Sequence, residues 1–157
     1  MLHLFESGAG PGRDTVLAAM FEARKRVFVD LLGWDVPVLA GRFEVDQFDD
    51  PHARYLVLTD GNGGHLGSAR LLDTRRPHIL GELYPDLCED AVPNGPGIFE
   101  ITRFCLDRRL RAAERLTVRN RLVSALVDQA LAAGIHRYTG VAERIGLDLV
   151  ASSDQCD

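Results

Sequence analysis

The sequence has few of the features that mark membrane, secreted or metal-binding proteins. No apolar run approaches the length of a membrane span, and residues 1–6 lack the basic start and apolar stretch of a signal peptide. The three cysteines are an odd number, at spacings that fit neither a disulfide framework nor a zinc site. The five histidines are scattered and form no metal-ligand pattern. We therefore expect a cytoplasmic protein with reduced thiols, no bound metal and no membrane insertion.

The protein is acidic overall, but much of its positive charge is concentrated in one stretch. The net charge of −5 argues against a nucleic-acid partner. Residues 103–121 nevertheless contain seven arginines and only two acids, Asp107 and Glu114. Such a basic surface on an acidic protein suits an acidic partner or an anionic ligand. A solvated helix face with no partner is the alternative.

The pattern of apolar residues and turn signals predicts one α/β domain over residues 1–157. At 157 residues the chain can bury a full core. Apolar periodicity and glycine-rich breaks predict strands at 2–6, 53–60, 65–72, 97–106 and 135–141, and helices at about 15–32 and 111–133. Asp14 is placed to cap the first helix, and residues 8–12 form a breaker cluster before it. This order predicts a mixed sheet flanked by helices, an α/β/α sandwich.

Each predicted helix has an apolar stripe. In the first helix the stripe consists of Leu17, Met20, Phe21, Val27, Phe28 and Leu31. Arg24 falls within it and therefore needs a partner, either an internal carboxylate or a bound anion. In the second helix we expect Leu116, Val123, Leu126, Val127, Ala130 and Leu131 to form the buried stripe. The segment 74–96 is interrupted by proline and glycine, with a helical turn expected near 85–91.

The strand at 97–106 contains two charged residues, Glu100 and Arg103. Charged residues are rare in core strands because a buried charge is costly unless it is paired or used. Strict alternation would put the two on opposite faces of the sheet. A β-bulge would turn both toward one cleft, as bulges near active sites often do, and we favour it. The alternative is an internal ion pair that holds the strand.

Other charged and aromatic residues occupy positions where a ligand could bind. Glu44 and Asp46 share a face of the segment 42–50, which alternates acids with aromatic residues. Carboxylates in such a setting could hold a cation or act as a general base, whereas a solvated acidic loop is the alternative. Trp34, the only tryptophan, lies in a turn where it could cover the core or contact a cation. Arg70 is another charge on a candidate core face.

Taken in order, these motifs resemble those of the acyl-homoserine-lactone synthases, the autoinducer synthases of bacterial quorum sensing. The matching segments are residues 23–34, 44–49, 67–72 and 100–105, and the resemblance extends over roughly residues 1–143. It implies an acetyltransferase-like (GNAT-like) fold. It also implies transfer of an acyl group from acyl carrier protein to the amine of S-adenosylmethionine, a substrate rather than a cofactor. Lactonisation then releases methylthioadenosine.

The resemblance also implies roles for individual residues. The catalytic set comprises Glu100, Glu44, Arg103 and Arg70, with either Glu100 or Glu44 as the base. The set that binds S-adenosylmethionine and the acyl chain comprises Arg24, Phe28, Trp34, Asp46, Asp49, Phe104, Thr139 and Gly140. Phe28 and Trp34 would contact the sulfonium, Asp46 and Asp49 the amine, and one of the three arginines the carboxylate. Arg109, Arg115 and Arg119 would bind the carrier protein.

The sequence departs from the family pattern at some positions. Residues 110–115 lack the glycine-rich turn on which coenzyme A pyrophosphate binds in ordinary acetyltransferases, so a carrier-protein donor is favoured. Tyr84 replaces a usual phenylalanine, and the match fades after about residue 143, where family members continue. The alternatives are therefore a coenzyme A-dependent acetyltransferase or an inactive relative that binds a ligand or partner. We expect a monomer.

Overall fold

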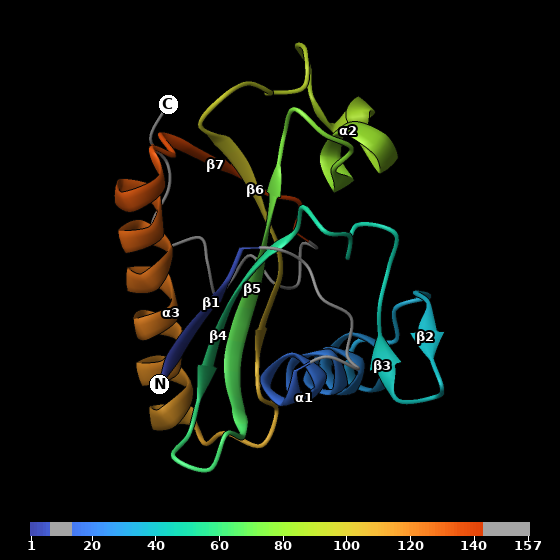
Figure 1. The fold of residues 1–157 in the computed structure, drawn as a ribbon. Helices are drawn as coiled ribbons and strands as arrows, with labels where there is room; N and C mark the ends of the chain where they lie inside the picture. Colours follow the sequence, from blue (N-terminus) through green and yellow to red (C-terminus); the bar gives the residue numbers. More distant parts are fainter. Residues whose placement is uncertain (7–13, 143–157) are drawn as a thin grey trace.

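A computed structural model describes residues 1–6 and 14–142 of the chain. The breaker cluster expected at 8–12 and most of the C-terminal tail lie outside these residues. The core is a five-stranded sheet with the strand order β1-β4-β5-β6-β7. Helix α1 (Thr15–Arg24) lies on one face of the sheet and α3 (Ala112–Ala133) on the other (Figure 1). The predicted α/β/α sandwich is therefore confirmed.

The sheet is antiparallel except at one edge. Strands β1 (Leu2–Phe5), β4 (Arg54–Thr59), β5 (His65–Asp73) and β6 (Ile98–Leu106) pair antiparallel in that order. Helix α3 then returns the chain so that β7 (Arg137–Thr139) pairs parallel with β6. A separate two-stranded ribbon is made by β2 (Val38–Leu39) and β3 (Phe43–Glu44). The predicted strands are confirmed, although β7 is shorter than the predicted segment.

Helix α1 begins as the sequence predicts but continues in a different geometry. The Asp14 carboxylate accepts hydrogen bonds from the backbone N–H groups of Val16 and Leu17. After Arg24 the helix widens into a π-helix over Lys25–Leu31, in which each turn contains an additional residue. Phe28 remains buried in this segment, whereas Leu31 is 54% exposed. The predicted stripe is therefore correct as far as Phe28 and wrong at Leu31, because the prediction assumed a period of 3.6 residues and the helix has a wider turn after Arg24.

The face of α3 that packs on the sheet differs from the predicted one. Its buried residues are Val118, Leu122, Ala125, Leu126 and Gln129. Of the predicted stripe, only Leu126 is buried and Ala130 is partly buried. The exposed members are Leu116, Val123, Val127 and Leu131.

Close packing against β5 explains this choice of face. A Cβ atom added at Gly67 would lie 2.9 Å from Val118 Cγ1, so the sheet has room for Val118 only because residue 67 is glycine. The helix carries apolar residues on two faces, and this local fit selects one of them.

A short helical region between β5 and β6 was only partly predicted. Helix α2 spans Ile79–Leu83, and a 3₁₀ turn over Pro85–Leu87 follows it. The sequence indicated the second of these but not the first. Of the helices in residues 14–142, none has both the length and the apolar character that crossing a membrane requires.

The packing of α3 can be tested with two leucines of the same helix. Leu122 is fully buried and Leu131 is 80% exposed. We expect Leu122→Ala to lower the free energy of unfolding by about 2–5 kcal/mol, because it removes apolar contacts and leaves a cavity. Leu131→Ala should change it by less than about 0.5 kcal/mol. Urea unfolding of both variants measures this, and equal effects would contradict the orientation of α3.

Candidate active site

A β-bulge in β6 is the backbone feature on which the site depends. Ser68 pairs with Cys105 and Arg70 with Thr102, so β6 contains one residue more than β5 across this interval. Arg103, at the bulge, has a φ of 51°, in the left-handed region that residues other than glycine rarely adopt. The extra residue turns Arg103 toward the face of the sheet where α1 lies. The predicted bulge is therefore confirmed.

Arg24 and Arg103 share one carboxylate oxygen. The Nε of Arg24 donates to Oε1 of Glu44 at 2.9 Å, and the Nε of Arg103 donates to the same oxygen at 2.7 Å. Arg24 also makes a two-point contact with Asp49, at 2.9 Å for each bond. Arg103 reaches Asp46 Oδ2 at 2.9 Å through Nη2. Arg24 therefore has internal carboxylates as partners, one of the two possibilities that the sequence left open.

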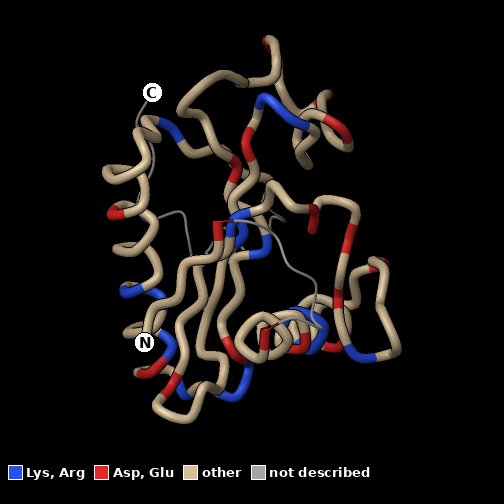
Figure 2. Tube along the Cα trace, in the orientation of Figure 1, with Lys and Arg blue, Asp and Glu red and all other residues tan. Residues whose placement is uncertain are grey.

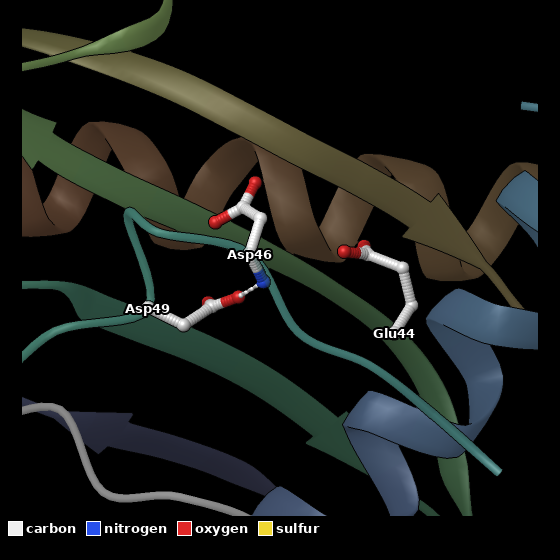
Figure 3. A group of neighbouring side chains, drawn as sticks. All are labelled: Glu44, Asp46 and Asp49. Carbon is white, nitrogen blue, oxygen red and sulfur yellow. Dashed lines mark hydrogen bonds between the residues drawn. The ribbon is translucent and has the colours of Figure 1, made fainter. Parts of the chain in front are cut away.

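Arg70 closes the network from β5. Its Nη1 and Nη2 donate to the two carboxylate oxygens of Asp46 at 2.6 and 3.1 Å, and Nη1 lies 2.9 Å from Asp49 Oδ1. Its Nε donates to the Thr102 hydroxyl at 2.8 Å. Figure 3 shows the three carboxylates, with the Asp46 backbone N–H donating to Asp49 Oδ2 at 2.8 Å. Three guanidinium groups and three carboxylates thus form one continuous network.

The network is buried and its formal charges cancel. Arg24, Glu44 and Arg70 are each at most 1% exposed. Burial alone would raise the pKa of Asp49, but the Arg24 and Arg70 guanidinium groups outweigh it and hold that pKa well below its usual range. Buried ion pairs are tolerated only with such complete pairing.

The three carboxylates are close enough together to surround a cation. One oxygen atom from each lies within 4.8 Å of the others. Each carboxylate already accepts bonds from arginine, however. The cluster therefore has no net negative charge to attract a metal ion.

Two aromatic rings lie beside Arg103. Phe28 and Trp34 are stacked, with ring centroids 4.6 Å apart and an interplanar angle of 29°. The Cζ of Arg103 lies 5.5 Å from the Phe28 centroid and 5.3 Å from that of Trp34. Here these rings contact an internal cation. Their predicted contact with a ligand cation stays a prediction.

Three polar groups at this site have unused hydrogen-bonding capacity. Oε2 of Glu44 and Nε1 of Trp34 are buried and have no hydrogen-bond partner within the described part of the chain. Nη1 of Arg103 takes part in none of the bonds described above, and that side chain is 7% exposed. Unsatisfied buried polar atoms are uncommon and costly in folded proteins, so Oε2 of Glu44 and Nε1 of Trp34 point to a ligand.

The Glu100 carboxylate forms its hydrogen bonds outside the arginine–carboxylate network. Its two carboxylate oxygens accept the backbone N–H groups of Ile79 and Leu80 at 2.9 and 2.8 Å, and the side chain is fully buried. These N–H groups belong to the first turn of α2, whose N-cap residue His78 makes no side-chain capping bond. Glu100 therefore caps α2 from a neighbouring strand. Sequence reasoning grouped it with Arg103, but its hydrogen bonds are to α2.

The predicted acyl-chain residues lie near the edge of the sheet. Phe104 is partly buried against the apolar core under α3. The Thr139 hydroxyl is buried and has no partner among the described residues. A Cβ added at Gly140 would lie 3.3 Å from the backbone oxygen of Ile101. Their predicted contact with an acyl chain stays a prediction.

The predicted docking arginines surround the start of α3, where Figure 2 shows basic positions. Arg109 binds the Asp107 carboxylate through Nε and Nη2 at 3.0 and 2.8 Å. Arg115 donates to the backbone oxygen of Asp107 at 3.2 Å, and Arg119 contacts the Asn120 side chain. Part of this positive charge is therefore neutralised by contacts with Asp107 of the same chain.

Sequence reasoning missed Tyr55. Its hydroxyl donates to Asp49 Oδ1 at 2.8 Å, and burial together with the Asp49 charge raises the pKa of Tyr55 above its usual value. A tyrosine inside the apolar run 55–58 was the available signal, because a buried phenol requires a polar partner.

The capping role of Glu100 can be tested by hydrogen exchange. Glu100→Gln replaces one accepting oxygen with an NH₂ group, which cannot accept the N–H of Ile79 or Leu80. We expect these two amides to exchange about tenfold faster or more, since a lost bond to a charged group is worth over about 1.4 kcal/mol. Glu89→Gln, in an exposed loop, is the matched control. Unchanged exchange at α2 would exclude the capping role.

Comparison of the whole chain with known proteins finds matches to one group of enzymes. A sequence model described as autoinducer synthase matches residues 12–146. An acyl-homoserine-lactone synthase of Ralstonia nicotianae is 34% identical over 145 residues, which cover 89% of this chain and 71% of that protein. A Pseudomonas fluorescens acyl-homoserine-lactone synthase is 35% identical over 106 residues, and the match spans about half of its length, 54%.

Solved structures agree with these sequence matches. The structure of BjaI, a coenzyme A-dependent acyl-homoserine lactone synthase, with S-adenosylmethionine and isopentyl-CoA matches 96% of this chain with a TM-score of 0.83 at 27% identity. The match covers 70% of that chain. TofI, in a complex with an inhibitor and methylthioadenosine, is 32% identical with a TM-score of 0.73, covering 89% of this chain and 71% of its own. A Pseudomonas aeruginosa acyl-CoA N-acyltransferase, at 18% identity and a TM-score of 0.58, shares the fold alone.

Proposed function

This chain belongs to the autoinducer synthase family, and on that basis we propose that it is an acyl-homoserine-lactone synthase. It transfers an acyl group from a thioester to the amine of S-adenosylmethionine. The carboxylate of the product then closes a lactone ring and releases methylthioadenosine. The observation that supports this function best is the buried arginine–carboxylate network, in which one carboxylate oxygen, Glu44 Oε2, has no partner among residues 1–6 and 14–142.

Glu44 is the group best placed to accept the substrate amine. An ammonium ion must lose a proton before its nitrogen attacks the thioester carbon. Oε2 of Glu44 is a buried acceptor to which no group in the described part of the chain donates, whereas both oxygens of Glu100 already accept backbone N–H groups. Asp46 and Asp49, the predicted amine ligands, are each bound to two arginines. We therefore assign the proton-accepting role to Glu44, and to Glu100 the positioning of α2.

The acyl-transfer step balances with the groups present. The ammonium gives one proton to Glu44, and the amine nitrogen forms a bond to the acyl carbonyl carbon. The carbon–sulfur bond of the thioester breaks, the nitrogen gives up its second proton to become the amide nitrogen, and the leaving thiolate takes up that proton. Arg24 and Arg103, both bound to Oε1, keep the Glu44 carboxylate in place throughout.

Acyl carrier protein is the donor that this surface favours. Helix α3 begins after Arg111, and the Glu114 carboxylate accepts the Arg111 backbone N–H at 2.9 Å. An acid at this helix N-terminus opposes the binding of a pyrophosphate there. The exposed Arg108 and Arg111 beside it suit an acidic protein. Coenzyme A thioesters, which solved relatives such as BjaI use, are the alternative donor.

The central test is product formation by this chain and by a Glu44 variant. Incubation with S-adenosylmethionine and acyl carrier proteins of several acyl lengths should release methylthioadenosine and a lactone that mass spectrometry identifies. Glu44→Gln keeps the size of the side chain but removes the base, so we expect turnover to fall by about 10²–10⁴-fold. Glu89→Gln should retain full turnover. Binding of S-adenosylmethionine without product at any acyl length would indicate an inactive relative.

The choice of donor has its own test. Replacing Arg109 and Arg115 together by alanine should raise the Michaelis constant for acyl carrier protein and reduce its dependence on salt, because fewer charges attract the carrier. The Michaelis constant for S-adenosylmethionine should stay the same. Arg75→Ala, at an exposed arginine beside α2, is the control. An unchanged constant for the carrier protein would mean that these arginines contribute nothing to docking.

A further inference from the structure

A cavity beside α2 lies outside the arginine–carboxylate network. It has a volume of about 370 Å³ and is lined by residues 74–78, residues 81–82, Val92 and Asn94. This is the part of the chain in which β5 ends, α2 follows and β6 is about to begin (Figure 1). The volume is in the range of small-molecule sites, about 300–1,000 Å³. None of the network residues lines this cavity, so it is separate from the candidate active site.

His78 contributes a buried hydrogen-bond acceptor to the wall of this cavity. The side chain is 5% exposed. Its Nδ1 lies 2.9 Å from the backbone oxygen of Arg76, which can only accept, so Nδ1 carries the ring proton. Nε2 of the neutral ring is then an acceptor, and no group among residues 1–6 and 14–142 donates to it. Because buried acceptors without a donor are uncommon and costly, Nε2 points to a ligand that donates a hydrogen bond.

Gly81 leaves space along the edge of the His78 ring. A Cβ atom added at position 81 would lie 2.9 Å from Cε1 and 3.1 Å from Nε2 of His78. Both residues line the cavity. Any side chain at position 81 would therefore touch the ring at its unpartnered nitrogen, and glycine is the residue that allows another group to approach closely there.

The cavity wall also carries one cation and one anion whose charges are not balanced by an ion pair. Arg75 binds the carboxylate of Asp73 through Nε and Nη2, which neutralises its charge. The side chains of Arg76 and Glu82 are exposed and form no ion pair within the described part of the chain. One positive group, one negative group and one buried acceptor therefore line the same cavity.

We propose that this cavity binds a free aliphatic α-amino acid. The carboxylate of the ligand contacts Arg76, and its ammonium donates to His78 Nε2 and to the Glu82 carboxylate. A ligand with a single charge would match only one of the two charged side chains, whereas a zwitterion matches both. Pro77 and Val92, which line the same cavity, suit an aliphatic side chain. This binding site does not depend on the proposed activity.

A ligand in this position also contacts both ends of the first turn of α2. His78 is the N-cap residue of that helix, and its backbone oxygen accepts the Glu82 backbone N–H at 2.9 Å. An ammonium that binds both side chains stabilises the closed turn. At ten times its dissociation constant the ligand should slow hydrogen exchange at the Glu82 amide by about tenfold, provided that opening of the turn releases it.

Calorimetry with L-leucine and two analogues tests the proposal. 3-Methylbutylamine lacks the carboxylate of leucine, and 4-methylpentanoate lacks its ammonium. We expect leucine to bind with a millimolar or lower dissociation constant. The amine should bind about two- to fivefold more weakly, because its lost contact is to an exposed arginine. The acid should bind about tenfold more weakly or worse, since it loses the buried bond to His78.

Two variants test the acceptor. His78→Asn retains a side-chain N–H that can reach the Arg76 backbone oxygen, but it has no group in place of Nε2, so the affinity for leucine should fall about tenfold or more. Gly81→Ala keeps all the polar groups and suits a helix, and it should weaken leucine binding by obstructing the same nitrogen. Glu89→Gln, in an exposed loop, should bind leucine as the wild type does.

Two further variants test the charges separately. Arg76→Gln should weaken the binding of leucine by about two- to fivefold and leave that of 3-methylbutylamine unchanged. Glu82→Gln should weaken leucine binding by a similar factor and leave the binding of 4-methylpentanoate unchanged. Arg121→Gln, at an exposed position of α3, is the control for loss of a positive charge.

The remaining outcomes decide against the inference or separate it from the proposed function. It would be overturned if leucine, valine and isoleucine all fail to bind at millimolar concentration, or if leucine and its two analogues bind equally well. Tighter binding of inorganic phosphate than of leucine would show an anion site instead. Displacement of leucine by S-adenosylmethionine would place the amino acid in the active site and also overturn the inference. A chain that makes no lactone but binds leucine as described would support the inference and count against the activity.

Discussion

The structure depends on the complete pairing of six buried charges. These charges meet under the first helix: Arg24 from α1, Glu44 from β3, Asp46 and Asp49 from the connection between β3 and β4, Arg70 from β5 and Arg103 from β6. Removing a charge from water costs several kcal/mol, and good geometry with full pairing offsets that cost. Loss of one partner from such a cluster typically costs about 3–5 kcal/mol, since it leaves a buried charge unbalanced. The sheet, α1 and the acidic segment are therefore held in one arrangement.

Much of the fold follows from local sequence signals, and the errors occur where tertiary packing decides. The Asp14 side chain caps the start of α1, and Gly134 ends α3 in a left-handed backbone conformation. Both signals can be read from the residue type, because aspartate is a common N-cap and glycine a common C-cap. The bulge was inferred because a carboxylate and a guanidinium in one core strand are difficult to place otherwise. The buried face of α3 was predicted wrongly because that helix has apolar residues on two sides. The close approach of Val118 to Gly67, which decides between them, cannot be inferred from the spacing of apolar residues in the sequence. Leu31 was mistaken because a period of 3.6 residues was assumed where the helix is wider.

The residues of the site were predictable, but their partners were not. A sequence shows which side chains carry charge and which faces they share. It was the resemblance to the autoinducer synthases that grouped Arg24, Glu44, Asp46, Arg70 and Arg103 in one site, and the structure brings these side chains together. It does not show backbone donors, so nothing indicated that Glu100 would bind the first N–H groups of α2. Nor does it show which buried polar atoms, such as Glu44 Oε2, have no partner among the described residues. Glu44 and Glu100 are chemically equivalent, and they differ only in the groups that surround them in the structure. Their different roles therefore cannot be predicted from the sequence.

The left-handed backbone of Arg103 has a consequence for how this protein can change. A residue with a side chain in this conformation costs about 1–2 kcal/mol, a strain that glycine alone would relieve. Glycine would at the same time leave Glu44 and Asp46 without the guanidinium that both now bind. Arginine at position 103 keeps the backbone strain, whereas glycine relieves the strain but leaves two buried carboxylates with fewer partners. A strand without this strain therefore requires changes at several residues of the network together. Position 103 is thus a point where conformational strain and charge balance oppose each other, and single substitutions have little room to improve the stability of the fold there.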